Sequence, residues 1–343
     1  MTTIQLKPID QQVVVVTGAS SGIGRATALL FAKRGAKVVA SARSQEGLDS
    51  LIQEIQQFGG DAVSVIADVA DFGQVQSIAE KAVQHYGRLD TWAHVAATGL
   101  FSKFEDIKPE EFKRVIEVNL LGQVYGAMVA LPHLRREGRG AFIAVTSVEA
   151  RRSLPLQSPY SASKHGVEGF IDSLRVELRR EGVPISITNI LPSTINTPFY
   201  NKGKTKLGVK PTGVPPYYEP ELVAESIVFA AENPRRDLIV GDAGRVLDLL
   251  QRISPALADT VLQLVAVDGQ HTTVKKNEDD PNNLYEPISS PGYDRTEGDF
   301  GHLVIPSFAE LLDFHPAVKW GAIAGISALA LLATQFLMDR ETI

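Results

Sequence analysis

The stretch QQVVVVTGASSGIGRA, residues 11–26, carries the signals that decide the fold. Its run of valines is β-branched and wholly apolar, which predicts a strand buried on both faces of a parallel sheet. Gly18, Gly22 and Gly24 follow directly, and a helix is expected to begin at Ile23. Glycines permit a tight turn and a close approach to a ligand, and a helix N-terminus attracts negative charge. This order predicts a loop that binds the diphosphate of a dinucleotide, the alternative being a plain strand-to-helix turn.

Further apolar runs of strand length follow along the chain: AKVVASA, DAVSVIAD, LDTWAHVAA, GAFIAVTS, PISITNILP and DLIVG. Segments with apolar residues at helical spacing separate most of them, including a long helix expected from about Glu110 to Arg136. Such an alternation predicts the α/β class: a Rossmann-like, doubly wound, seven-stranded parallel sheet with helices on both faces. We assign this domain to residues 1–267.

The bulk composition excludes several classes of protein. The 343 residues carry a formal net charge of -6, so no basic field argues for binding of nucleic acid. The chain contains no cysteine, which excludes disulfides, thiolate nucleophiles and cysteine metal sites. Its seven histidines show no helical metal-ligand spacing, and no metal site is expected. The N-terminal residues lack the basic flank and apolar run of a signal peptide.

The stretch LQSPYSASKHGVEGF, residues 156–170, places Tyr160 and Lys164 four apart at the expected start of a helix. Residues at this spacing share one helix face. A phenol with an ordinary pKa of about 10 is a poor proton shuttle near neutrality unless a positive charge stabilises the phenolate. The small residues between the two leave room for a flat ring. We therefore expect Tyr160 to transfer a proton with help from Lys164.

Together, TGASSGIG and the pair Tyr160 and Lys164 resemble the short-chain dehydrogenase/reductase family, in its main oxidoreductase branch. The spacings concerned are Thr-Gly-x-x-x-Gly-x-Gly and Tyr-x-x-x-Lys, and the resemblance covers residues of about 10–245. It implies a nicotinamide-dependent oxidoreductase in which Tyr160 exchanges the proton of the substrate oxygen. Lys164 would lower the tyrosine pKa and hold the ribose, Ser147 would orient the oxygen, and Asn119 would connect the site to a relay water.

The resemblance also implies a set of cofactor contacts. These are Gly18, Ser20, Ser21, Gly22, Ile23, Gly24, Arg43, Asp68, Val69, Ala96, Asn119, Tyr160, Lys164, Pro192, Thr194 and Thr197. The second expected strand ends in SARS, without the carboxylate that would bond the ribose hydroxyls of NAD. Arg43 in this stretch suits a 2'-phosphate, which favours NADP over NAD. Asp68 resembles the family's adenine contact, its alternative being a helix cap.

The chain departs from the family pattern after the fourth expected strand. Where the family has Asn-Asn-Ala-Gly, residues 94–97 read HVAA. Ala96 keeps the small residue that lets the cofactor lie close, whereas His94 and Val95 replace the side-chain amides. We interpret His94 as structural, and we expect weaker ties between this strand and its neighbour.

The chain changes character near Asp268. Residues 268–307 are rich in charge, Pro, Gly and Asn, which predicts a polar and disordered linker. The segment 308–343 contains an uncharged run over 321–338, whose 18 residues would reach roughly 27 Å as a transmembrane helix. This run predicts a C-terminal membrane anchor with the enzyme in the cytosol. The alternative is a helix in the interface of a soluble cytoplasmic homo-oligomer.

The expected function is that of an NADP-dependent carbonyl reductase or alcohol dehydrogenase. Residues 199–218 carry aromatic side chains and are expected to cover the substrate, which indicates an apolar ketone or secondary alcohol. One alternative is a dinucleotide-binding regulatory or scaffold protein without catalysis. Another is an isomerase on the same fold.

Overall fold

The computed structural model describes residues 4–290 and 292–308 of the chain. Its centre is a parallel sheet of seven strands in the order β10-β7-β6-β4-β1-β2-β3. The strands are β1 (Val13–Thr17), β2 (Lys37–Ala42), β3 (Asp61–Ile66), β4 (Thr91–His94), β6 (Gly140–Val145), β7 (Ile185–Pro192) and β10 (Asp237–Val240). Each predicted strand is therefore confirmed. The order reverses at β1, which pairs with β2 on one side and β4 on the other, and such a reversal opens a ligand crevice.

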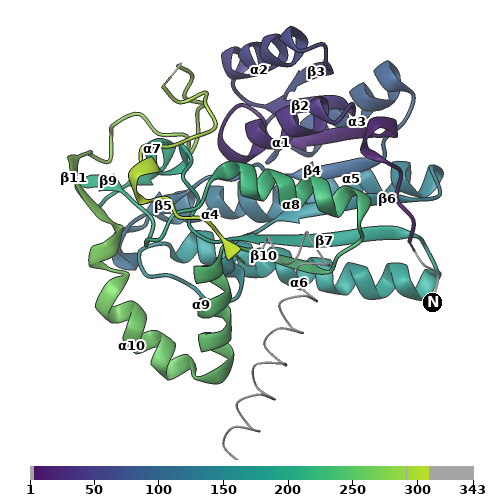
Figure 1. Ribbon diagram of the computed structural model, residues 1–343. Coiled ribbons are helices and arrows are strands. Elements are labelled where there is room, and N and C mark those ends of the chain that lie inside the picture. Colours follow the sequence, from purple (N-terminus) through teal and green to yellow (C-terminus); the bar gives the residue numbers. More distant parts are fainter. Residues whose placement is uncertain (1–3, 291, 309–343) are drawn as a thin grey trace, which may run out of the picture.

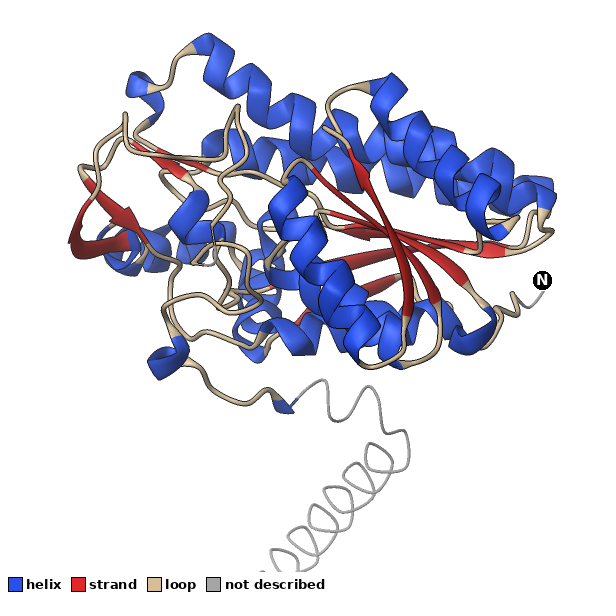
Figure 2. Ribbon diagram, turned by 90° about the horizontal axis from the view of Figure 1, so that it is seen from above, coloured by secondary structure: helices blue, strands red, loops and turns tan. Residues whose placement is uncertain are grey.

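Helices cover both faces of this sheet, as Figure 2 shows from above. They are α1 (Gly22–Lys33), α2 (Gln45–Gln57), α3 (Phe72–Tyr86), α4 (Pro109–Ile116), α5 (Gly122–Arg136), α6 (Ser158–Glu181) and α8 (Pro220–Glu232). Beyond the sheet lie α7 (Phe199–Lys202), α9 (Asp242–Ile253) and α10 (Pro255–Val265), with the short pairs β5 (Leu100–Phe101) with β8 (Lys204–Thr205) and β9 (Val209–Pro211) with β11 (His271–Lys275). The doubly wound α/β prediction is confirmed.

The valine run of β1 explains why the sheet is buried on both sides. Val14 and Val16 belong to the apolar cluster under α1, α2 and α8, while Val13 and Val15 belong to the cluster under α3, α5 and α6. Alternate side chains of a strand point to opposite faces, so one apolar run serves both cores. This arrangement fixes the end of β1, and with it the glycine loop, at the centre of the sheet.

The long helix expected from Glu110 to Arg136 is interrupted. A π-helical turn, η3 (Glu117–Leu121), separates α4 from α5 and contains the buried Asn119. Among the described residues, the stretch Pro109–Arg136 is also the helix long and apolar enough to cross a membrane, but half of its most apolar window is buried. A core helix of a soluble domain passes the same test. The predicted anchor over 321–338 lies outside the described residues.

Residues 268–308 differ from the predicted linker. After β11, which pairs with β9, the chain runs back over the body of the domain (Figure 1) and ends its described part beside α9. Leu284 is fully buried and Phe300 nearly so, the latter stacked on Tyr217 with ring centroids 4.9 Å apart. Backbone groups of the segment make several of the hydrogen bonds that hold it, and such bonds require no apolar periodicity in the sequence. We name residues 277–300, apart from 291, the C-terminal strap.

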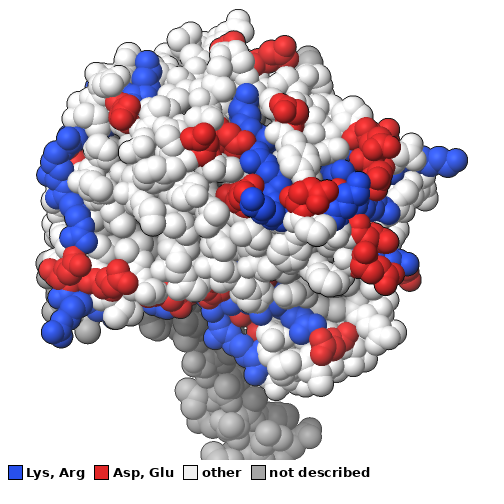
Figure 3. Space-filling model, turned by 180° about the vertical axis from the view of Figure 1, so that it is seen from behind, with Lys and Arg blue, Asp and Glu red and all other residues white. Residues whose placement is uncertain are grey.

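Charges of both signs are interspersed over the face shown in Figure 3. Among the ion pairs of the domain, Arg175 and Arg236 both pair with Asp172. A nucleic-acid-binding face needs a stripe of one sign. The charges on this face are mixed instead, and the absence of a nucleic-acid partner stays a prediction.

Candidate active site

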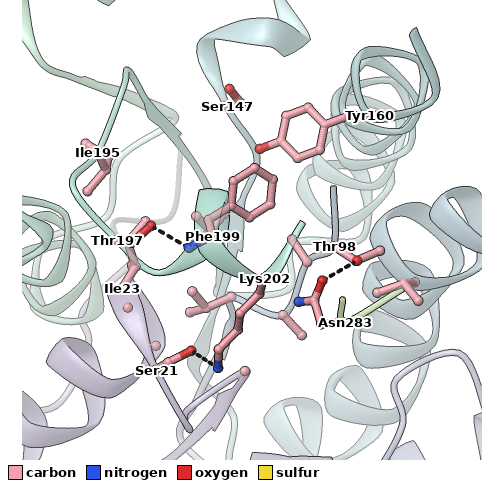
Figure 4. Close-up of a pocket in the computed structure, with 18 of the residues that line it drawn as sticks. Ser21, Ile23, Thr98, Ser147, Tyr160, Ile195, Thr197, Phe199, Lys202 and Asn283 are labelled. Carbon is pink, nitrogen blue, oxygen red and sulfur yellow. Dashed lines mark hydrogen bonds between the residues drawn. The ribbon is translucent and has the colours of Figure 1, made fainter. Parts of the chain in front are cut away.

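A pocket opens at the carboxyl ends of the central strands. It is lined by every predicted cofactor contact except Asn119, and also by Ser147. Parallel strands bring their carboxyl ends to one edge of the sheet, so residues far apart in sequence meet there. Figure 4 shows Tyr160 and Ser147 at one side of this pocket and Ser21 and Ile23 at another. The predicted site residues therefore converge on one cavity.

The glycine loop forms one wall because a side chain would not fit there. Gly18 has a φ of +71°, and a Cβ on it would lie 2.7 Å from the Cα of Ala96. A Cβ on Gly24 would lie 2.2 Å from the carbonyl oxygen of Gly18. The loop thus presents bare backbone and the N-terminus of α1 to the pocket, as binding of a diphosphate requires. The residues present fit a nicotinamide dinucleotide.

The candidate catalytic groups lie opposite this loop. Tyr160 stands on the first turn of α6, and Ser147 lies two residues after the end of β6. Ser147 and Tyr160 both line the pocket, and the Ser147 hydroxyl acts to lower the pKa of the phenol against the larger effect of burial. The Lys164 ammonium donates to the carbonyl oxygen of Val145 at 3.0 Å and lies 5.3 Å from the centre of the Tyr160 ring. Three of the predicted catalytic residues thus form one cluster.

The protonation state of this cluster differs from the prediction. Burial raises the pKa of Tyr160 well above its ordinary value, and the negative charge of Glu149 raises it further. Burial lowers the pKa of Lys164 to about 7, against the opposing effect of Glu149. The expected lowering of the tyrosine pKa is therefore wrong for this structure, since a desolvated lysine loses much of its own charge near neutrality.

Glu149 is a buried carboxylate that the sequence analysis missed. Its Oε2 accepts a hydrogen bond of 2.6 Å from the Ser161 hydroxyl, and its backbone amide donates to the Ser147 hydroxyl at 3.1 Å. Burial raises the pKa of Glu149 to about 7. Its position two residues after Ser147 was the available signal, since a glutamate so close to the end of a buried strand needs a polar partner if it is buried.

Asn119 is not among the residues that line the pocket, and its predicted contact with the cofactor stays a prediction. Its side chain accepts from the Thr98 amide at 2.8 Å and donates to the Thr98 carbonyl at 3.0 Å and to the Ser163 hydroxyl at 3.2 Å. Asn119 thereby ties the loop after β4 to α6. These hydrogen bonds replace part of the support that the side-chain amides missing from HVAA would give to the loop.

His94 is fully buried under that loop. Its Nδ1 faces the indole N–H of Trp92 at 3.3 Å. Burial, together with the charge of Lys164, lowers the pKa of His94 to about 3. The ring is thus neutral and wedged in the core, in agreement with a structural role.

Arg43 and Asp68 mark the far end of the pocket. The guanidinium of Arg43 donates to the carbonyl oxygens of Tyr285 at 2.6 Å and Asn283 at 2.5 Å, both in the C-terminal strap. Asp68 lies 3.8 Å from Arg43 and pairs with Arg114 at 2.5 Å. The two carbonyl oxygens of the strap orient the Arg43 side chain. Because an arginine has five N–H donors, the remaining donors are left for a ligand.

Other pocket residues carried no local signal in the sequence. Asn283, Pro287 and Ile288 of the strap line the cavity, as does Lys202 of α7. Asn283 accepts a hydrogen bond from the Thr98 hydroxyl at 3.1 Å, drawn in Figure 4. The strap residues lie far from the motifs in sequence, and only the folded chain brings them to the site.

A comparison with known families agrees with this geometry. Residues 12–207 match the family model for short chain dehydrogenases. The chain belongs to the short-chain dehydrogenase family. The family resemblance inferred from the glycine loop and the Tyr160–Lys164 pair is therefore confirmed.

Individual relatives of this short-chain dehydrogenase extend the comparison. The uncharacterized oxidoreductase YxnA of Bacillus subtilis (strain 168) is 36% identical over 331 residues, which cover 96% of this chain and 92% of the relative. The 3-oxoacyl-acyl-carrier-protein reductase FabG of Thermotoga maritima is 35% identical over 230 residues, covering 66% of this chain and 92% of FabG. Because the match to YxnA covers 96% of the chain, it includes most of residues 268–308.

A solved structure gives the same result for the fold. An alcohol dehydrogenase from the archaeon Thermococcus sibiricus, complexed with 5-hydroxy-NADP, is similar with a TM-score of 0.59 and 26% identity. The similarity covers 67% of this chain and 95% of that chain. These relatives and the family match establish the protein as an NAD(P)-dependent oxidoreductase.

Proposed function

We propose that this short-chain dehydrogenase is an NADP-dependent carbonyl reductase or alcohol dehydrogenase acting on an apolar ketone or secondary alcohol. The observation that carries the proposal is that Ser147 and Tyr160 line the same cavity as the glycine loop. Two hydroxyls in one cavity suit a single substrate oxygen, which one orients and the other protonates.

When bound, the nicotinamide supplies or accepts the hydride. In the reductive direction, Ser147 donates a hydrogen bond to the carbonyl oxygen and Tyr160 gives that oxygen its phenolic proton. The raised pKa of Tyr160 keeps the phenol protonated and ready to donate near neutrality. The Lys164 side chain donates to the carbonyl oxygen of Val145, which ties the end of β6 to α6, and its nitrogen lies beside the phenol ring. Asn119 fixes α6 to the loop after β4, which positions these groups.

The substrate class follows from the side chains around the hydroxyls. The same cavity is lined by a group of apolar residues, namely Val148, Leu154, Ile195, Phe199 and Val214. The Phe199 ring lies 5.6 Å from the Tyr160 ring, so a flat or branched apolar group would be enclosed beside the reacting oxygen. An apolar lining with few polar groups is typical of a site for small apolar ligands.

The test is a screen of apolar ketones and secondary alcohols with NADPH, NADH and their oxidised forms, followed by nicotinamide absorbance. We expect turnover of apolar ketones with NADPH, and weaker turnover with NADH. Turnover confined to charged substrates would contradict the substrate class, and failure with every carbonyl and alcohol would contradict the reaction.

Replacing Arg43 by Ala is expected to weaken NADPH more than NADH, because only NADPH carries a 2'-phosphate. A lost charge-assisted hydrogen bond costs about 1.5–3 kcal/mol, or roughly a tenfold to hundredfold rise in Kd. Titration of both cofactors by fluorescence measures the ratio of the two Kd values. Arg43→Lys, which keeps the charge, is the matched control and should lose less. If the affinity for both cofactors fell equally, Arg43 would only hold the strap and would not contact the 2'-phosphate.

We also propose that the enzyme is tethered to a membrane by the run 321–338, with the catalytic domain on the cytosolic side. Two features support this. The described chain ends at the start of α9, where the Phe308 amide donates to Asp242 at 2.9 Å. The neighbouring helices α9 and α10, at the lower edge of Figure 1, expose several apolar side chains: Val246, Leu249, Ile253, Leu257 and Leu264.

A further inference from the structure

Lys202 lies where the diphosphate of a dinucleotide would be expected. It is the last residue of α7, and its ammonium donates to the Ser21 hydroxyl at 3.0 Å. Ser21 belongs to the glycine loop and precedes the first turn of α1. Figure 4 shows the Lys202 side chain reaching across the pocket to this serine. The Lys202 ammonium and the N-terminus of helix α1 therefore face the same space.

The ammonium of Lys202 is buried and only partly paired. Its side chain is 7% exposed, and its acidic neighbour is Asp294 of the strap, at 3.5 Å. A well-formed bond between an ammonium and a carboxylate measures about 2.7–2.9 Å, so this pair is loose. Burial lowers the pKa of Lys202, while Asp294 opposes that change. A buried cation with spare N–H donors gains from a second anion in the same cavity.

Other lysines of the same segment are fully engaged elsewhere. Lys204 and Lys206 both pair with Glu111, at 2.9 and 2.8 Å. Neither lines the pocket, whereas Lys202 does. The position of Lys202 is thus not a general property of a basic stretch. Of these three lysines, Lys202 is the one whose ammonium lies beside the glycine loop.

We propose that Lys202 is a cofactor-binding residue whose ammonium contacts the diphosphate of the nicotinamide dinucleotide. The strap supplies Asp294, which holds the ammonium at the pocket wall. The inference rests on the proposed function only in requiring that the pocket bind a dinucleotide. It differs from the role of Arg43, because the diphosphate is common to NADPH and NADH. Loss of Lys202 therefore affects both cofactors alike.

The test is calorimetric titration of Lys202→Met with NADPH, NADH and adenosine 2'-monophosphate, which lacks a diphosphate. The Kd of both dinucleotides is expected to rise roughly tenfold to hundredfold, by loss of one charge-assisted contact. The Kd of adenosine 2'-monophosphate is expected to stay within a factor of two or so of the wild-type value. Lys202→Arg keeps the charge and should recover part of the affinity.

Lys204→Met is the matched control, since it removes an ammonium two residues along and leaves Glu111 paired with Lys206. Its dinucleotide affinity should equal that of the wild type. Thermal unfolding of each variant separates a binding loss from a folding loss. If Lys202→Met binds NADPH and NADH as tightly as the wild type does, the inference is overturned while the proposed function stands. If its affinity for adenosine 2'-monophosphate falls equally, Lys202 only ties the strap to the domain. If the wild type binds no dinucleotide, the proposed function itself fails.

Discussion

Replacing Tyr160 by Phe is expected to abolish turnover while leaving the cofactor bound. The substitution keeps the ring against Phe199 and removes only the phenolic hydroxyl from the pocket. General acid catalysis by a positioned group contributes about a hundredfold to ten-thousandfold, and we expect a loss of kcat in that range or beyond. Steady-state rates with the best ketone of the screen measure the loss, and NADPH fluorescence measures the Kd. A variant with wild-type kcat would remove Tyr160 from the mechanism.

Glu149→Gln tests the same proton transfer without deleting a reacting group. The negative charge of Glu149 raises the pKa of Tyr160, so its removal should lower that pKa. Alcohol oxidation requires Tyr160 to accept a proton, and its rate rises with pH as the phenol ionises. The rising limb of kcat/KM for oxidation should therefore move to lower pH in Glu149→Gln. A limb that stays in place, or moves to higher pH, would show that Glu149 does not act on Tyr160 electrostatically.

The sequence predicted the sheet because its signals are local. Four apolar residues from Val13 to Val16 suffice to identify a strand buried on both faces, since successive side chains point to opposite sides. The site follows from the sheet, because Ser147 lies two residues after β6 and the glycine loop directly follows β1. Parallel strands then place these loops at one edge. Tyr160 could be predicted to join them because α6 begins shortly after β6.

The protonation of the site could not be predicted from spacing. Lys164 stands one turn from Tyr160, as expected, but the balance of charge depends on burial and on Glu149. A lysine that is 1% exposed loses hydration, and its pKa falls towards neutrality. The π-helical turn at Asn119 could not be predicted either. It allows Asn119 to donate a hydrogen bond to Thr98, which lies in a distant loop.

The strap was misread partly because several of its contacts are made by backbone carbonyls. Arg43 binds the carbonyl oxygens of Asn283 and Tyr285, residues about 240 positions away. The Gly22 amide likewise donates to the carbonyl oxygen of Arg295 at 2.8 Å. Such bonds place no demand on side-chain type, so the segment keeps the polar, glycine- and proline-containing composition of a linker. Composition therefore predicted disorder where the fold supplies partners.

A chain that ends at Val267 is expected to lose most of its cofactor affinity and much of its stability. A domain boundary at 267 would instead predict a folded and active form. Truncation there removes the carbonyls that orient Arg43 and the strap residues that line the pocket. It also exposes the surfaces that bury Leu284 and Phe300. Burial of such side chains contributes about 1.5–3 kcal/mol each, against a total stability of about 5–15 kcal/mol for a typical protein.

A chain that ends at Phe308 is the matched control for this truncation, because it keeps the strap and removes only residues 309–343. It should bind NADPH with the Kd of the full-length chain and unfold at the same temperature. The full-length chain should sediment with membranes even in high salt, which screens charge but not apolar burial, whereas the chain ending at Phe308 should be released. If the chain ending at Val267 binds NADPH as tightly as the chain ending at Phe308, the strap is dispensable for the cofactor site. If the full-length chain stays in the soluble fraction, the run 321–338 is no anchor, and packing between copies of the chain becomes its better explanation.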